Sequence, residues 1–341
     1  MIDLSCDYNC GCAPEILSAL EAANGEQHAT YGFDDISERA KEKIKLAVGN
    51  ADAEVFFLVG GTQTNATVLS SILAPYQGVL SAGSGHIAVH EAGAIEYTGH
   101  KVLTVGGDEY GRIDLEALRG WLRAFSGDAT RTHMVQPGAV YVSHPTEYGG
   151  LYTAAQLREL RAICDEYGLK LFLDGARLAY ALAARGADVD LKLLGELCDV
   201  FYIGGTKCGA LLGEAVVFKK PEPFFFTTHK QHGALLAKGF LIGLQFDALF
   251  TDGLYLRLGA QAIDCAEKLR EGLYELDVGF CPESRTNQQF PYLSDEQLEK
   301  LDGRIGYEIW ERRGGGAVVR LCTSWRTTAA DIDAVLGALG Q

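Results

Sequence analysis

The segment Asp199–Gly213, DVFYIGGTKCGALLG, decides the fold assignment because it places one lysine, Lys207, between two apolar runs. The first run, Val200–Ile203, has the length and composition of a buried strand, and two glycines follow it. Burying an ammonium group without a partner is strongly unfavourable, so such a lysine either shifts its pKa or reacts. Taken alone, Lys207 leaves a second interpretation open, that of a surface lysine after a strand.

A second strand-like segment supplies a partner for this lysine. In Leu169–Leu182, LKLFLDGARLAYAL, Asp174 ends an apolar run. One helix and one strand would span the interval from Asp174 to Lys207, so we expect both side chains at neighbouring strand ends. A lysine with a lowered pKa suits Schiff-base chemistry, and an aspartate can pair with a pyridinium nitrogen. The pair therefore indicates a pyridoxal phosphate (PLP) site.

Composition and charge limit the class of protein. The 341 residues are 48% hydrophobic and 22% charged, which is typical of a globular chain long enough for two lobes. A net charge of −15 argues against nucleic-acid binding. The N-terminal MIDLSCDYN lacks the features of a signal peptide, and polar residues interrupt the longest apolar stretch, Gly233–Phe250. We therefore expect a cytoplasmic protein without a membrane segment.

The cysteines favour a reduced protein without a metal site. There are nine, and none of them forms a CxxC pair. The closest pair is Cys10-Gly-Cys12, with Cys6 nearby, and a zinc site would require a second cluster at ligand spacing.

Strand-like and helix-like segments alternate from Ala53 to Ile203, which predicts a mainly parallel sheet with helices on both faces. In such sheets ligands bind at the carboxyl ends of the strands. After Leu254 a long helix, short strands and a closing helix predict a smaller α+β lobe. We predict an N-terminal arm (1–14), a large PLP-binding α/β domain (15–252) and a small C-terminal domain (253–341). The candidate residues that follow predicted strands are Gly61, His86, Glu147, Asp174 and Lys207.

The segment Gly60–Asn65, GGTQTN, lies between a predicted strand, Ala53–Val59, and a predicted helix, Ala66–Leu73. A strand, a glycine-rich turn and a helix together present backbone N–H groups to a phosphate. The segment is neither a dinucleotide fingerprint nor a Walker A loop. A tight turn needs glycine in any case, so a purely structural interpretation stays open.

Together these motifs resemble, in family order, those of the threonine aldolase / β-eliminating lyase family over nearly the whole chain. The resemblance implies a PLP enzyme of fold type I, the aspartate aminotransferase-like fold. It also implies a large domain with a mainly parallel, seven-stranded sheet between helices and a smaller α+β C-terminal domain. The motifs are Met1–Leu4, Tyr31-Gly32, Gly60–Asn65, His86 with Glu91-Ala92-Gly93, Asp174–Arg177, Thr206-Lys207 and Val319–Leu321.

The resemblance assigns roles around the cofactor. It implies that Lys207 holds PLP as a covalent aldimine, that Asp174 pairs with the pyridine nitrogen, and that Arg177 reaches the ring hydroxyl oxygen. For Arg177, an exposed helix arginine is the alternative. The other implied cofactor residues are His86, stacked on the ring, and Gly61, Thr62, Gln63 and Lys230 around the phosphate. Lys230 takes the place of a family arginine that reaches the phosphate across a subunit interface.

The resemblance also implies a substrate site. Arg320 would bind the substrate carboxylate, although a surface charge on an edge strand is the alternative for this residue. Where the family has a serine before an aspartate in the N-terminal arm, this chain has Cys6, with Ser5 adjacent. Tyr31 is expected to contribute across the interface of a homodimer or homotetramer.

The predicted activity is cleavage of a β-hydroxy-α-amino acid, such as L-threonine, L-allo-threonine or a phenylserine, to glycine and an aldehyde. His86 or Glu147, directly or through water, is the expected base, and Glu147 stands where many relatives have a histidine. The alternatives are another fold-type I reaction (β-elimination, transamination or racemisation) or a scaffold that only binds a nucleotide or another partner.

Overall fold

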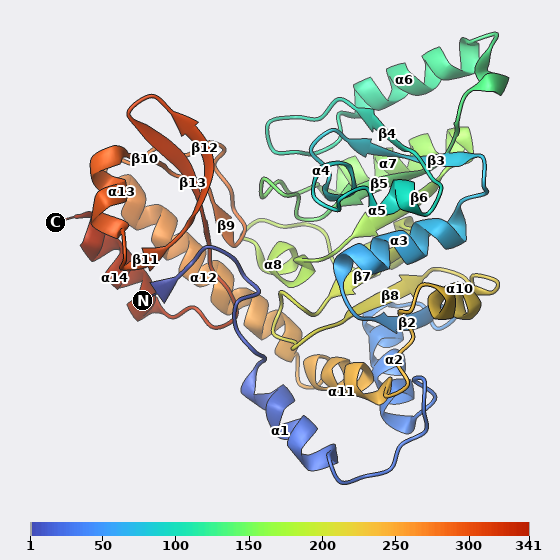
Figure 1. Cartoon of the computed structure of the whole chain (residues 1–341), viewed down its shortest axis with the longest axis horizontal. Helices are drawn as coiled ribbons and strands as arrows, with labels where there is room; N and C mark the ends of the chain where they lie inside the picture. The colour runs from blue at the N-terminus through green and yellow to red at the C-terminus, as the bar shows by residue number, and fades with distance from the viewer. Residues whose placement is uncertain (1, 341) are drawn as a thin grey trace.

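The computed structural model describes residues 2–340 and consists of two lobes joined by a long helix (Figure 1). Met1, part of the MIDL motif, lies outside the described residues. No helix within residues 2–340 is long and apolar enough to cross a membrane.

The large lobe is built on a seven-stranded sheet with the order β2-β8-β7-β6-β5-β3-β4. Only β8 runs antiparallel to its neighbours β2 and β7, so the predicted mainly parallel sheet is confirmed. Strand β8 was not predicted, although four of its five residues, AVVF, are apolar. The strands are β2 (Glu54–Leu58), β3 (Gln77–Ala82), β4 (Val102–Val105), β5 (Gln136–Ser143), β6 (Lys170–Asp174), β7 (Val200–Gly204) and β8 (Glu214–Phe218).

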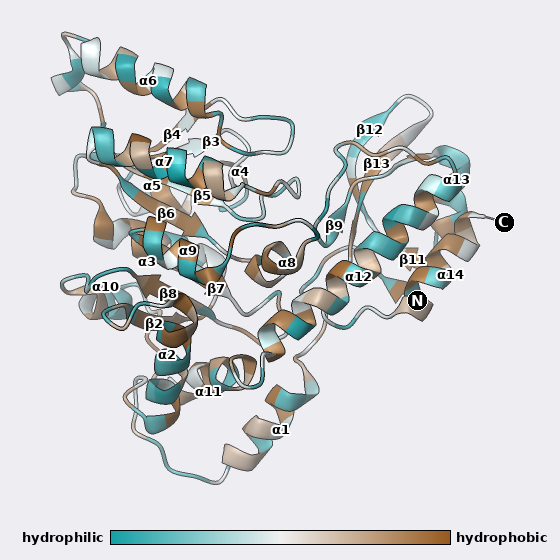
Figure 2. Cartoon of the chain, turned by 180° about the vertical axis from the view of Figure 1, so that it is seen from behind, coloured by the Kyte–Doolittle hydropathy of each residue, from teal (hydrophilic) through white to brown (hydrophobic). Residues whose placement is uncertain are grey.

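Helices cover both faces of this sheet, because alternate strand residues point to opposite sides and both sides are apolar. Leu171 and Leu173 belong to one hydrophobic cluster, and Phe172 between them belongs to the other. Figure 2 shows hydrophobic strands between helices with hydrophilic outer faces. The first cluster includes α1 (Pro14–Ala23), α2 (Asp35–Val48), α6 (Leu115–Gly127), α7 (Ala154–Tyr167), α8 (Leu178–Ala183), α9 (Leu191–Leu197) and α11 (Phe240–Leu249), and the second includes α3 (Gly61–Ile72), α4 (His86–Val89), α5 (Ala94–Tyr97) and α10 (Phe225–Gln231).

Helix α3 begins earlier than predicted. The expected start was Ala66, but the helix starts at Gly61, so Gly61, Thr62 and Gln63 form its first turn instead of a loop. Gly60 is extended (φ −169°) and its carbonyl accepts the Thr64 N–H at 2.9 Å. The glycine, threonine and asparagine residues of this segment are weak helix formers, and the burial of Thr64 and Asn65 overrides that propensity.

The C-terminal lobe packs a small antiparallel sheet against three helices. The segment from Gln288 to Ser294 forms two short strands separated by Phe290 and Pro291, since proline has no N–H for a ladder hydrogen bond. Thr328 caps the closing helix in a capping box with Asp331. The elements are α12 (Leu254–Glu275), β9 (Gln288–Gln289), β10 (Tyr292–Ser294), α13 (Asp295–Leu301), β11 (Ile305–Gly306), β12 (Glu308–Arg313), β13 (Gly316–Cys322) and α14 (Ala329–Leu339).

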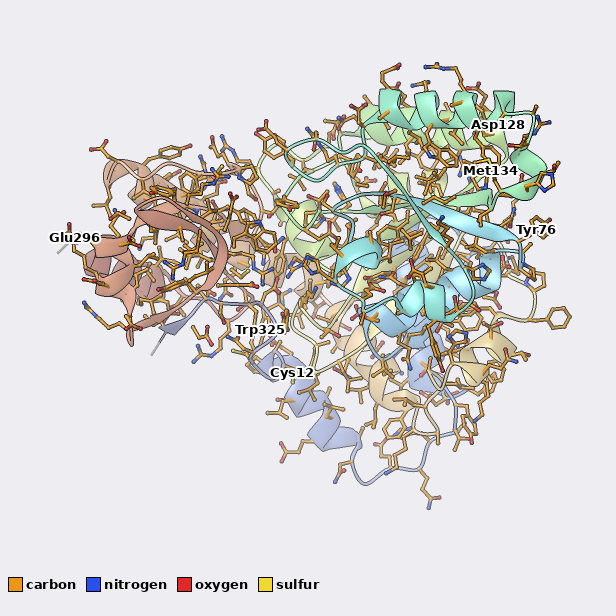
Figure 3. All side chains as sticks on the ribbon, turned by 45° about the horizontal axis from the view of Figure 1, so that its top comes forward. Cys12, Tyr76, Asp128, Met134, Glu296 and Trp325 are labelled. Atoms are coloured by element: carbon orange, nitrogen blue, oxygen red, sulfur yellow. The ribbon has the colours of Figure 1, made fainter. Side chains whose placement is uncertain are left out.

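The N-terminal arm connects the two lobes. Strand β1 (Ile2–Asp3) pairs in parallel with β11 of the C-terminal lobe, and the chain then runs to α1 on the large lobe (Figure 1). Cys12 from the arm and Trp325 from the C-terminal lobe both pack against the large-lobe core, and Figure 3 labels them close to the junction. The division into 1–14, 15–252 and 253–341 stays a prediction.

Candidate active site

A cavity of about 250 Å³ lies where the carboxyl ends of β5, β6 and β7 meet the N-terminus of α3. Seven predicted site residues line it: Gly61, Thr62, His86, Glu147, Asp174, Arg177 and Lys207. Seven other residues complete the lining, and sequence reasoning had given none of them a role: Tyr8, Ser143, Pro145, Ala176, Tyr202, Thr206 and Glu214. Of these, Ala176 and Thr206 belong to the motifs Asp174–Arg177 and Thr206-Lys207. The remaining predicted residues, Ser5, Cys6, Gln63, Tyr31, Lys230 and Arg320, lie outside this lining.

Lys207 follows β7 and presents its amine to the cavity. Burial and the positive charge of Arg177 lower the pKa of Lys207, which increases the share of neutral amine. The Tyr180 hydroxyl donates to the Lys207 carbonyl at 2.5 Å and fixes the backbone at this point. The ring of Tyr8, from the N-terminal arm, lies 5.7 Å from Nζ. The surface-lysine interpretation is therefore wrong.

Asp174 ends β6 as an ionised carboxylate on the cavity wall. Burial would raise its pKa, but the neighbouring His86 imidazole and the hydrogen bond from Tyr141 outweigh burial and lower the pKa of Asp174. Its Oδ2 accepts from the Tyr141 hydroxyl at 2.6 Å and from Asn65 Nδ2 at 3.1 Å. Of these partners, Asn65 belongs to the GGTQTN motif.

The lining residues fit the functional groups of PLP. The first N–H groups of α3 have no intrahelical partner, and no described side chain caps this end, so they can bind a phosphate. The carboxylate of Asp174 suits a protonated pyridine nitrogen, and the amine of Lys207 suits an aldehyde. Gly61 and Thr62 of GGTQTN line the cavity in addition to forming the first turn of α3.

His86 and Glu147 form a hydrogen-bonded group beside Asp174. His86 Nδ1 contacts Glu91 Oε1 at 2.7 Å, which assigns the proton to Nδ1 and leaves Nε2 free of this contact. Glu147 Oε1 accepts from the His86 N–H at 3.0 Å and from the Ser143 hydroxyl at 2.8 Å. Burial raises the pKa of Glu147, so this carboxyl can exchange a proton nearer to neutral pH.

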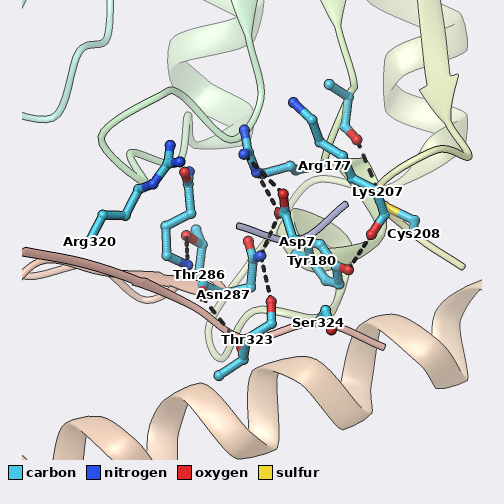
Figure 4. A network of polar contacts seen from close by, with 12 residues as sticks. Asp7, Arg177, Tyr180, Lys207, Cys208, Thr286, Asn287, Arg320, Thr323 and Ser324 are labelled. Carbon is cyan, nitrogen blue, oxygen red and sulfur yellow. Dashed lines mark hydrogen bonds and ion pairs between the residues drawn. The ribbon is translucent and has the colours of Figure 1, made fainter. Parts of the chain in front are cut away.

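Arg177 is buried, which contradicts the exposed-helix alternative. It lies between β6 and α8, and its guanidinium forms a bidentate pair with Asp7 of the N-terminal arm (Figure 4). Burial opposes the charge on Arg177, but the carboxylate of Asp7 raises the pKa of Arg177 above its ordinary value. Asp7 was not among the predicted site residues.

Arg320 lies on β13, the central strand of the C-terminal sheet, so the edge-strand alternative is wrong. It is half-buried, forms an ion pair with Glu308, and places its guanidinium carbon 5.3 Å from the Trp310 ring centre. Its Nη2 donates to the Ser5 carbonyl at 3.4 Å, which brings the arm segment Ser5-Cys6 beside it. Elsewhere, Lys230 Nζ lies 4.4 Å from the Tyr31 ring centre.

Glu214 is a buried carboxyl on β8 next to the Lys207 loop, and its Oε2 accepts the Gly205 N–H at 3.0 Å. Burial raises the pKa of Glu214 to about 8, from an ordinary value of 4.5. The folded protein therefore holds a proton that the unfolded chain releases above about pH 4.5. The resulting contribution to stability is complete below that pH and is lost as the pH rises to about 8.

Replacing Glu214 with glutamine should remove this pH dependence. As the pH rises from 5 to 8, the parent is expected to lose on the order of 2–4 kcal/mol of unfolding free energy relative to Glu214→Gln. Urea unfolding of the cofactor-free proteins at both pH values measures this difference. Glu299→Gln, at an exposed position, is the control and should follow the parent. Parallel pH profiles for Glu214→Gln and parent would contradict the prediction.

Known proteins share both the sequence and the fold of this chain. The family model for beta-eliminating lyases matches residues 3–296. A low specificity L-threonine aldolase from Pseudomonas sp. (strain NCIMB 10558) is 32% identical over 97% of both chains. The structure of a threonine aldolase from Leishmania major has a TM-score of 0.96 at 38% identity and covers 100% of this chain and 99% of its own.

More distant structures share the fold alone. An aspartate aminotransferase double mutant from Thermus thermophilus has a TM-score of 0.69 at 15% identity and covers 99% of this chain and 90% of its own. Together with the mainly parallel sheet, these structures confirm the expected fold-type I architecture.

Proposed function

The chain belongs to the beta-eliminating lyase family, and from this membership we propose that it is a PLP-dependent aldolase. Its substrate would be a β-hydroxy-α-amino acid of the threonine type, which it cleaves to glycine and an aldehyde. The observation that carries this proposal is the single cavity that Lys207, Asp174 and the N-terminus of α3 share. Relatives named low specificity L-threonine aldolase support the substrate class.

In this proposal each residue around the cavity binds a different group of the cofactor. When bound, PLP supplies an electron sink for the bond that breaks at the amino acid Cα. Lys207 Nζ would be the amine that holds the cofactor covalently, and the carboxylate of Asp174 would hold the proton on the pyridine nitrogen. The guanidinium of Arg177 would serve the ring hydroxyl, and the imidazole of His86 would serve the ring itself.

The phosphate group would be held at the start of α3. Gly61 and Thr62 contribute free N–H groups of the first turn and line the cavity. Gln63 lies in the same turn, but its amide is directed away: Nε2 donates to the His232 carbonyl at 3.5 Å. We therefore assign Gln63 to the phosphate through its backbone only.

Removal of the β-hydroxyl proton requires a base, and we assign this role to Glu147, with His86 as the second candidate. One oxygen of Glu147 is held by Ser143 and the His86 backbone, so the carboxyl has a fixed orientation on the cavity wall. His86 is committed to Glu91 through Nδ1, which orients its ring for stacking. A carboxyl with a raised pKa is a suitable proton acceptor near neutral pH.

The substrate carboxylate is assigned to Arg320. Its planar guanidinium suits a bidentate carboxylate, and the ring of Trp310 contacts it while Glu308 occupies its donors. An incoming carboxylate would replace Glu308 as the partner of Arg320. Ser5 and Cys6, beside Arg320, complete this end of the substrate site.

The protein is also inferred to be at least a homodimer, in line with the subunit-interface sites that the family resemblance implies. Tyr31 and Lys230 contact each other outside the Lys207 cavity of their own chain. A symmetric dimer would let this pair reach the phosphate of a neighbouring site. The molecular mass in solution tests this assignment.

Product analysis separates the aldolase from other PLP reactions. The holoenzyme is incubated with L-threonine, L-allo-threonine and a phenylserine, and the aldehyde and glycine are quantified. Equal amounts of the two products are expected. Formation of pyruvate or a 2-oxo acid with ammonia would instead favour β-elimination or transamination by the same site.

A further inference from the structure

We propose that Asp7 is a positioning residue that holds Arg177 at the cofactor site and makes this placement depend on the docking of the C-terminal lobe. The inference rests on the proposed function, because it takes Arg177 to face the cofactor. It adds a residue of the N-terminal arm to the cofactor site. It also implies that the position of the C-terminal lobe affects the charge around the Lys207 amine.

Both carboxylate oxygens of Asp7 are occupied by buried donors. Oδ2 accepts from Arg177 Nε at 2.6 Å and from Asn287 Nδ2 at 2.8 Å, and Oδ1 accepts from Arg177 Nη2 at 3.1 Å. The Asp7 side chain has no exposed area. A guanidinium held through two parallel hydrogen bonds has a fixed direction as well as a fixed position.

Three parts of the chain meet at this carboxylate (Figure 4). Asp7 belongs to the arm, Arg177 to the large lobe and Asn287 to the C-terminal lobe, immediately before β9. Asn287 is itself fixed, because its Nδ2 also donates to the Thr323 carbonyl at 2.9 Å and its own carbonyl accepts the Thr323 N–H at 2.9 Å. Displacing the C-terminal lobe would therefore remove one of the donors to Asp7.

The same carboxylate balances the charge beside the reacting amine. The positive charge of Arg177 lowers the pKa of Lys207, and the negative charge of Asp7 opposes that effect. If Asp7 loses its charge, Arg177 remains as an uncompensated cation and disfavours the protonated form of the Lys207 nitrogen. Asp7 thus sets the electrostatics of the site without contacting the reacting atoms.

A pH titration of the holoenzyme tests this role by spectroscopy. The absorbance of the Lys207-bound cofactor is followed from pH 5.5 to pH 9.5 for the parent and for Asp7→Asn, which keeps the shape of the side chain and removes its charge. The midpoint is expected to fall by about one pH unit or more in the variant. A purely structural ion pair would lower the melting temperature and leave this midpoint in place.

Asp247→Asn is the matched control. Asp247 also pairs with an arginine, Arg39, at 2.8 Å, but it lies outside the Lys207 cavity. The control is expected to titrate like the parent. A folded Asp7→Asn holoenzyme whose midpoint stays within about 0.3 units of the parent overturns the proposal, since a nearby opposite charge should shift a pKa by at least about one unit.

Asn287→Ala tests whether the placement of Arg177 depends on the C-terminal lobe. It also provides a second test of the proposal if Asp7→Asn does not fold. It keeps every charge and removes the hydrogen bond from the C-terminal lobe. The dissociation constant for PLP, measured by fluorescence titration, is expected to rise about tenfold. An unchanged constant overturns the lobe dependence, whereas a parent protein that takes up no PLP overturns the proposed function and this assignment with it.

Discussion

Lys207→Ala is expected to reduce aldehyde release from threonine-type substrates by at least about 10⁴-fold, the scale on which enzymes lose activity when their covalent nucleophile is removed. In the parent, a half-buried amine with a lowered pKa faces the same cavity as the Asp174 carboxylate. An alanine at this position leaves no amine to attach to the cofactor. The other contacts of the cavity persist, so PLP should still bind, but reversibly.

Two measurements on Lys207→Ala separate loss of chemistry from loss of folding. The bound cofactor should be removed by dialysis in the variant and retained in the parent, and the melting temperatures of the cofactor-free proteins should be similar. Lys220→Ala is the control, because Lys220 is exposed and lies outside the cavity lining. Full turnover by Lys207→Ala, with the parent's absorbance band, would contradict the assignment of Lys207.

Much of this site was predictable because a parallel sheet brings its strand ends together. Asp174 and Lys207 end neighbouring strands, and the pairing of β6 with β7 places them on one edge of the sheet. The same argument placed Glu147 after β5 and His86 after β3. Local patterns were sufficient here, since each residue follows a short apolar run of the length typical of a buried strand.

The contacts from remote parts of the chain were not predictable from local patterns. Asp7 binds Arg177 across 170 residues and Asn287 across 280 residues, and neither spacing has a periodicity that a sequence can reveal. Strand β8 was missed for a different reason. Its apolar run, EAVVF, closely follows GALLG, and its antiparallel direction depends on a tight return after Lys207.

Glu147→Gln addresses the identity of the base, for which Glu147 and His86 are the two candidates. The amide can still accept hydrogen bonds from Ser143 and the His86 N–H through its oxygen, so the cavity should keep its shape. It cannot take a proton. Because positioned proton transfer contributes about 10²–10⁴-fold, kcat for L-threonine is expected to fall by that factor with little change in KM.

The pH dependence and a second variant make the test of Glu147 specific. A base acts in its deprotonated form, so the parent rate should rise as the pH passes the raised pKa of Glu147, and Glu147→Gln should lose this rise. His86→Phe keeps an aromatic ring for stacking and removes the imidazole. If Glu147 is the base, His86→Phe costs less in kcat than Glu147→Gln and retains the rise with pH. If instead His86→Phe costs more in kcat and it alone loses the pH dependence, His86 is the base. Glu147 would then hold the His86 backbone through the 3.0 Å hydrogen bond.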